Sequence, residues 1–174
     1  MERWKQFEIN SSNYLNNVLN IDDIKTSTDG GGNSRETDIK LYHKSNLLFS
    51  IEVKLSPSQS GQFVVKFKNN KFFLSEENHS LNSYSSKIIE VLNEKKLDYN
   101  GEHLHIDCGD DLCFKWIKNH YLKKGVEFLI TSDSIDSFYS IIPLSRINDF
   151  FQVSCVIRKK KSGTSDIPIK DRLG

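Results

Sequence analysis

The sequence predicts a single α/β domain, and three observations carry that prediction. A helical period opens the chain, a run of alternating strands follows, and short buried strands come after two further helices. The length of 174 residues fits one domain that buries roughly two thirds of the surface its unfolded chain would expose. We therefore expect one domain over 1–174, with a basic C-terminal strand and tail from about residue 152.

The first half of the chain reads as a helix followed by two hairpins. Residues 2–19 place apolar side chains three and four positions apart, which indicates a helix. The glycine-rich stretch 27–36 lacks the Gly-Lys-Ser/Thr of a phosphate loop and is expected to be an ordinary loop. The strands are expected at 37–43, 47–55, 62–68 and 71–75, with Asn69-Asn70 turning the last pair.

The second half alternates helices with buried strands. Helical spacing covers 80–96 and 110–123, and the apolar runs 126–131 and 138–144 read as buried strands. After them, we expect a short helix over 146–151 and a final strand over 152–160.

Composition sets limits on class and compartment. The net charge is +1, so the overall charge of the chain does not indicate a nucleic-acid partner. Basic residues nevertheless gather at 158–161 and 115–124. No apolar run approaches the ~20 residues that span a bilayer, and the N-terminus lacks the apolar stretch of a signal peptide. Three cysteines do not form a disulfide framework, so we expect a cytoplasmic protein.

Two carboxylates and a lysine fall on one face of the hairpin 37–55. With a three-residue turn Lys44-Ser45-Asn46, Asp38 faces Glu52, and Lys54 shares the face of Glu52. Phe49, Ile51, Val53 and Leu55 make an apolar row on the other face. The prediction depends on the turn, because a two-residue loop would put Asp38 opposite Val53.

Like charges directly opposite one another destabilise a sheet unless a cation lies between them. Mg²⁺ is held by one or two carboxylates and keeps several waters, and such an ion activates water and neutralises a phosphate. The set Asp38, Glu52 and Lys54 therefore suits hydrolysis of a phosphodiester. Glu8 lies on the flank of the apolar face of helix 2–19, where a carboxylate is costly unless it is paired or binds metal; the alternative is that it only caps or extends to solvent.

A glutamate on the first helix, then Asp, then Glu-x-Lys on the next strand resembles the PD-(D/E)xK nuclease superfamily. Here the motif is Glu8, Asp38 and Glu52-Val53-Lys54, with Thr37 in place of the proline. The resemblance covers residues 2–75 most closely. It implies a restriction-endonuclease-like mixed β-sheet flanked by helices, and the family includes type II restriction endonucleases, Holliday-junction resolvases and repair nucleases.

The resemblance also implies a role for each residue of the motif. Asp38 and Glu52 would bind the divalent metal, Mg²⁺ with Mn²⁺ as a substitute, together with the carbonyl of Val53. Lys54 would orient or activate the attacking water, and Glu8 would be an auxiliary acidic residue at the metal. Gln59 and Gln62 follow the motif and rank below these.

The basic C-terminal strand favours a restriction-type endonuclease on DNA, with a resolvase as the alternative. We expect Arg158, Lys159, Lys160 and Lys161 to contact phosphates, with Ser162 or Thr164 near a base or the backbone. Cutting two strands with one site per chain suggests a homodimer.

Two other readings compete with the nuclease. The stretch 103–113 offers His103, His105, Cys108 and Cys113, but the spacing is wide for zinc and no second pair follows. A strand leading into a helix with buried cysteines explains it better. A non-catalytic DNA-binding module or assembly subunit could share the sheet, although the intact Asp38, Glu52 and Lys54 argue against it.

Overall fold

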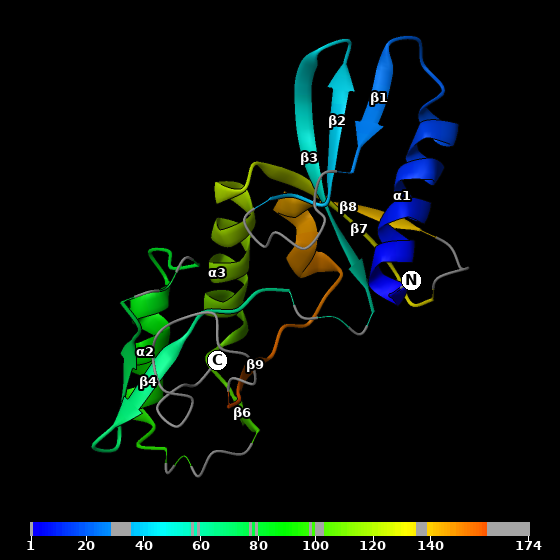
Figure 1. Ribbon diagram of the computed structural model, residues 1–174. Coiled ribbons are helices and arrows are strands. Elements are labelled where there is room, and N and C mark those ends of the chain that lie inside the picture. The colour runs from blue at the N-terminus through cyan, green and yellow to red at the C-terminus, as the bar shows by residue number, and fades with distance from the viewer. Residues whose placement is uncertain are drawn as a thin grey trace. The chain divides into compact units, whose positions relative to one another are not determined.

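The computed structural model describes residues 2–28, 36–56, 58, 60–76, 78, 80–97, 99, 103–134 and 139–159 (Figure 1). These fall into two compact units, which are described separately below. The first comprises 1–60 with 121–150, and the second comprises 61–120 with 151–174. No helix in these ranges is both long enough and apolar enough to cross a membrane.

The first unit is a five-stranded mixed sheet with the order β1-β2-β3-β7-β8. Its strands are β1 (Ile24–Ser27), β2 (Ile39–His43), β3 (Asn46–Leu55), β7 (Val126–Ser132) and β8 (Ser140–Pro143). β3 and β7 run parallel, and the other neighbouring pairs are antiparallel. The mixed sheet confirms the predicted fold class.

Helix α1 (Arg3–Leu19) packs on β1 and β3 (Figure 1). Its buried Phe7 and Leu15 join Ile39, Ile51 and Val53 in the core of the unit. A 2.6 Å hydrogen bond between the hydroxyls of Ser12 and Thr26 fastens the helix to β1. The apolar face of this helix was overestimated, because Trp4 and Val18 are exposed.

The rest of the first unit packs at the β7–β8 end of the sheet. β8 leads into a 3-10 helix, η1 (Leu144–Asp149), two residues earlier than the short helix expected from the sequence. Leu144 and Ile147 of η1 are buried. β1 was not predicted from the sequence, and it extends the predicted sheet by one strand.

The second unit contains two small sheets and helical cover. β4 (Val65–Lys68) pairs with β5 (Lys71–Leu74), and β6 (Leu104–Ile106) pairs with β9 (Cys155–Ile157). Helix α2 (Ser85–Glu94) packs on β5. Helix α3 (Asp110–Lys123) begins in this unit, and its last residues belong to the first unit. α2 and β9 are shorter than the sequence predicted.

Candidate active site

The hairpin β2–β3 brings the predicted residues together, by a different route from the one expected. The turn has two residues, Lys44-Ser45, because His43 pairs with Asn46, so the predicted three-residue turn was wrong. A bulge then inserts Leu48, and the ladder resumes with Leu41 opposite Phe49. The extra residue restores the register that a longer turn would have given.

Downstream of the bulge the predicted register holds. Lys40 pairs with Ser50 and Ile39 pairs with Ile51, so Asp38, one residue before β2, comes opposite Glu52. Ile51 and Val53 point into the core, as predicted, and Glu52 and Lys54 share the other face. Glu52 is nevertheless only 4% exposed.

Asp38 is held by the backbone of the neighbouring strand. Its Oδ2 accepts a hydrogen bond from the backbone N–H of Val53 at 2.7 Å. Burial raises the pKa of the Asp38 carboxyl, and the charge of Glu52 raises it further, while Lys54 and the Val53 N–H lower it. The fold therefore keeps two carboxylates close enough to repel one another.

Two lysines contact the two oxygens of Glu52. Lys54 Nζ lies 2.8 Å from Oε1 and 3.9 Å from Asp38 Oδ2. Lys124 Nζ lies 2.9 Å from Oε2, and its side chain is only 11% exposed. The carboxylate is thus neutralised by ammonium groups at the positions where a metal cation would approach it.

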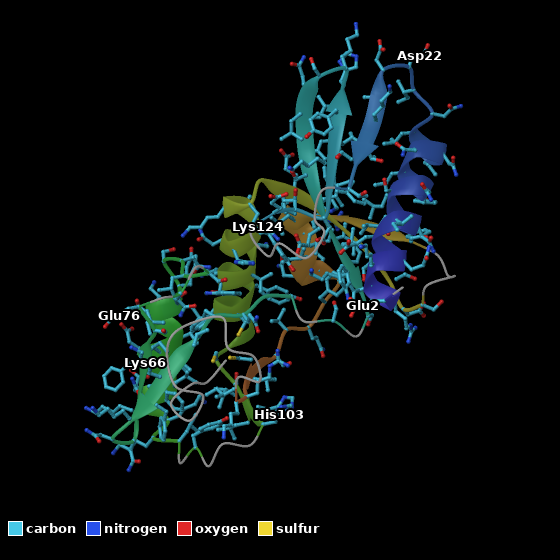
Figure 2. The ribbon with its side chains drawn as sticks, viewed as in Figure 1. Glu2, Asp22, Lys66, Glu76, His103 and Lys124 are labelled. Atoms are coloured by element: carbon cyan, nitrogen blue, oxygen red, sulfur yellow. The ribbon has the colours of Figure 1, made fainter. Side chains whose placement is uncertain are left out.

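Lys124 was not predicted as a site residue and entered the sequence analysis only within the basic stretch 115–124. It lies in the turn between α3 and β7, beside Gly125 with φ +74°. β7 pairs in parallel with β3, and the pairing begins with Val126 opposite Ser50. The turn before Val126 therefore lies close to Glu52. Figure 2 labels Lys124.

The charges of the site affect the pKa of Glu8. Burial raises the pKa of the Glu8 carboxyl to about 7; the charge of Asp38 adds to that rise, and Lys54 opposes it. Among the residues described, no hydrogen bond or ion pair joins Glu8 to Asp38, Glu52 or Lys54. Glu8 is therefore a neighbour of the cluster rather than a direct contact.

Tyr121, at the end of α3, is a second residue of the site that the sequence analysis missed. Its side chain is completely buried, and its hydroxyl donates a hydrogen bond to the backbone oxygen of Ser60. Burial raises the pKa of Tyr121, and the charges of Glu52 and Asp38 raise it further. Tyr121 therefore stays neutral within range of the charges of Glu52 and Asp38.

The donor set fits a divalent hard cation with water ligands. Asp38 and Glu52 supply two carboxylates, which is the number that Mg²⁺ commonly takes from protein. No cluster of three or more acidic, histidine or cysteine side chains in the described ranges is arranged as a complete metal site. The residues thus suit an ion that shares its shell with water and substrate.

The rival zinc stretch has a different organisation. Cys108 hydrogen-bonds with Cys113, which lowers its pKa, but hydrogen bonding to Cys155 and burial outweigh this and raise the pKa to about 12. The three thiols are free of disulfides, and His103 and His105 are exposed. β6 leads through a short loop into α3, as the structural reading predicted.

The predicted DNA-contacting residues are partly described. Arg158 is half-buried, and its Nη2 lies 3.5 Å from Oε1 of Gln62, while Lys159 is exposed. Lys160, Lys161, Ser162, Thr164 and Gln59 lie outside the described residues. Contact of this segment with DNA remains a prediction.

Comparison with known proteins gives one informative likeness. No family model and no curated protein matches the chain. Its fold is similar to that of HhaI endonuclease in a complex with DNA, with a TM-score of 0.80 and 34% sequence identity. The alignment covers 94% of this chain but 62% of the endonuclease chain, so this chain spans less than two thirds of that protein's length. The match supports a restriction-endonuclease-like fold.

Proposed function

We propose that this chain is a metal-dependent DNA endonuclease of the PD-(D/E)xK type, most closely a type II restriction endonuclease. The observation that carries the proposal is the placement of Asp38, Glu52 and Lys54 on one face of a restriction-endonuclease-like sheet. The likeness to HhaI endonuclease bound to DNA supports DNA as the substrate.

Each residue has a task in this proposal. Asp38 and Glu52 would hold Mg²⁺, or Mn²⁺ as a substitute, and the carbonyl of Val53 would add a backbone ligand. Such an ion lowers the pKa of a bound water and neutralises charge on the phosphate. The attacking water gives up one proton and its oxygen bonds to phosphorus, while the bond to the leaving sugar oxygen breaks and that oxygen takes up a proton. Lys54 orients the attacking water and offsets the negative charge that builds on the phosphate.

Lys124 has a second task at the same carboxylate. Without metal, it and Lys54 together neutralise Glu52, which lowers the cost of keeping a buried charge. Lys54 would serve the attacking water and the phosphate, and Lys124 would fix the orientation of Glu52 through Oε2. Lys124 is thus a positioning residue, and Glu8 is an auxiliary acid at the edge of the site.

Two alternatives are distinguished by the DNA that is cut. A resolvase uses the same carboxylates and lysine but cleaves four-way junctions. A non-catalytic DNA-binding module would retain the sheet and bind without cleavage. The buried repulsion between Asp38 and Glu52 favours an active site, because a module without chemistry gains nothing from it.

The deciding experiment incubates plasmid DNA and a four-way junction with the protein, with and without Mg²⁺. Discrete plasmid fragments that require Mg²⁺ support the restriction enzyme, and cutting of junctions alone supports the resolvase. Asp38→Ala, Glu52→Ala and Lys54→Ala should each abolish cleavage while retaining DNA binding in Ca²⁺, which fits oxygen ligands in a looser geometry. Full activity of Glu52→Ala in Mg²⁺ would overturn the mechanism.

A further inference from the structure

The second unit contains a two-stranded ribbon with one covered face. β4 and β5 are joined by Asn69-Asn70, whose φ angles of +51° and +57° suit a tight hairpin turn. The covered face holds buried Val65 and Phe72, with the rings of Phe67 and Phe72 4.7 Å apart. An isolated two-stranded hairpin is marginally stable, so the packing of α2 on β5 stabilises the ribbon.

Asparagine side chains complete backbone hydrogen bonds of the ribbon. Asn93 of α2 accepts from the backbone N–H of Phe72 at 2.7 Å and donates to its carbonyl at 3.0 Å. Asn78 makes the same pair of bonds with Val64, just before β4. Asn93 takes the place of a missing neighbouring strand beside β5. Asn78 binds Val64 at the end of the ladder, where the backbone N–H of Ser75 also donates to the Val64 carbonyl.

The other face of the ribbon carries three lysines and a phenylalanine. Lys68 pairs directly with Lys71, and Lys66 pairs with Phe73, so the four side chains share one face. Phe73 is 48% exposed. Figure 2 shows nitrogen-tipped side chains gathered around the turn of this ribbon, with Lys66 labelled on β4.

This arrangement costs stability in the isolated protein. Two like charges directly across a ladder repel each other. Among the side chains that the structure describes, no carboxylate forms an ion pair with Lys66, Lys68 or Lys71. A stripe of positive charge that no described carboxylate pairs with is complementary to a polyanion of regular shape.

We propose that the exposed face of the β4–β5 ribbon docks on double-stranded DNA, with Lys66, Lys68 and Lys71 on phosphates and Phe73 against the groove. The major groove of B-DNA, about 12 Å wide, admits a two-stranded ribbon. This inference rests on the proposed function and assigns to the nuclease a DNA-contacting element other than the basic C-terminal strand. The apolar ring of Phe73 between the lysine positions suits contact with thymine methyl groups or sugars.

The test is a salt titration of duplex binding. The affinity for a 20-base-pair duplex is measured between 50 and 300 mM salt, in Ca²⁺ and with the Lys54→Ala background to prevent cleavage. The ribbon variant replaces Lys66, Lys68 and Lys71 with Gln. If each lysine neutralises one phosphate, the slope of log affinity against log salt should become shallower by roughly 2.7, at about 0.9 per contact.

The matched control replaces Lys87, Lys95 and Lys96 with Gln. These are exposed lysines on or just after α2, so the change in net charge and the unit are the same. We expect the control to keep the wild-type slope. A ribbon variant with an unchanged slope would overturn the proposal, and so would an equal change in the control, because that would reflect total charge alone.

Two further measurements separate the possible failures. Thermal melting should show the ribbon variant at least as stable as the wild type, since the repulsion between Lys68 and Lys71 is gone. If the variant is folded and still binds the duplex with wild-type affinity, the ribbon is not the DNA-docking surface. Cleavage of plasmid by the protein with Lys54 intact tests the nuclease separately. If the wild type binds duplex through the ribbon but never cuts, the proposed function fails while the docking surface stands.

Discussion

Nζ of Lys124 lies 2.9 Å from Oε2 of Glu52, although 72 positions of sequence separate the two residues. Replacing Lys124 with Met removes one of the two cations on a buried carboxylate. We expect the free energy of unfolding in EDTA to fall by about 1.5–3 kcal/mol, the usual worth of a hydrogen bond to a charged group. Urea denaturation measures this loss.

Lys25 on β1 offers a matched control, because it is an exposed lysine of the same unit. Lys25→Met should change the free energy of unfolding by less than about 0.5 kcal/mol. If Mg²⁺ binds at Glu52, saturating Mg²⁺ should reduce the deficit of Lys124→Met, since the metal then neutralises the carboxylate. An equal deficit with and without Mg²⁺ would count against a metal at Glu52.

Asp38→Asn should increase stability and abolish cleavage together. Burial and Glu52 raise the pKa of Asp38, so the charged form is less favourable in the folded chain than in the unfolded chain. The amide removes that charge, and its oxygen can still accept the bond from the Val53 N–H. Thermal melting at pH 7 in EDTA should therefore give a higher Tm than the wild type, while plasmid cleavage in Mg²⁺ is lost.

Asp23→Asn is the control, because it makes the same chemical change at an aspartate outside the proposed site. Asp23 is exposed and forms a 3.7 Å ion pair with Lys44 at the tip of the hairpin. Its replacement should leave cleavage intact and change stability by less than about 1 kcal/mol, as surface ion pairs usually do. A Tm of Asp38→Asn below that of the wild type would contradict the repulsion inferred at the site.

Glu8 should make the metal-free protein less stable as the pH rises. Its pKa is about 7 in the folded chain and near 4.5 when unfolded, so the folded state binds the extra proton between these values. The stabilisation is present below pH 4.5 and is lost as the pH rises through 7. Glu8→Gln imitates the protonated form, so in EDTA it should raise the Tm much more at pH 8 than at pH 5. A Tm difference that is the same at both pH values would exclude titration of Glu8.

The faces of the central hairpin could be predicted because alternation is a local property. Ile51 and Val53 had to share a face opposite Glu52 and Lys54, whatever partner strand they met. The position of Asp38 opposite Glu52 was predicted correctly from a wrong turn, because the bulge at Leu48 adds the residue that the turn lacks. No sequence rule distinguishes an extra residue in the turn from one in the strand.

Lys124 and Tyr121 could not be assigned to the site from sequence. Their contribution depends on the parallel pairing of β3 with β7, which brings distant segments together. Parallel strands are joined by long crossover connections, so no local turn in the sequence reveals which strands pair. A lysine at the end of a helix is usually a solvated residue. The short strand β1 was missed for a related reason, because four residues carry too little alternation to detect.

The basic C-terminal segment should contribute to DNA affinity independently of the ribbon. Replacing Arg158, Lys159, Lys160 and Lys161 with Gln should make the salt slope shallower by roughly 1.8 if two of the four contact phosphates in each chain. Fluorescence anisotropy with a labelled duplex measures the slope. Because the strand and the ribbon are distinct elements, combining the two variants should give additive slope changes. A quadruple variant with the wild-type slope would mean that the segment does not touch DNA.

Deletion of Leu48 should be tolerated, whereas deletion of Tyr42 should not. Leu48 is the unpaired residue of the bulge, so its loss leaves Tyr42 opposite Leu47 and Leu41 opposite Phe49 in a regular ladder. Asp38 then still comes opposite Glu52, and we expect cleavage to persist. Deleting Tyr42 shortens the other strand, so that with the turn and bulge kept, Asp38 comes opposite Ile51, whose side chain lies in the core.

Both deletions remove one residue from the same hairpin, so a general effect of shortening the hairpin cannot explain different outcomes. We expect the Tyr42 deletion to lose Mg²⁺-dependent cleavage and to unfold at a lower urea concentration, because the shift exposes apolar side chains and moves Asp38 off the polar face. Plasmid cleavage and urea denaturation measure both effects. Retained cleavage after deletion of Tyr42, or its loss in a folded Leu48 deletion, would show that the register of β2 against β3 does not build the site.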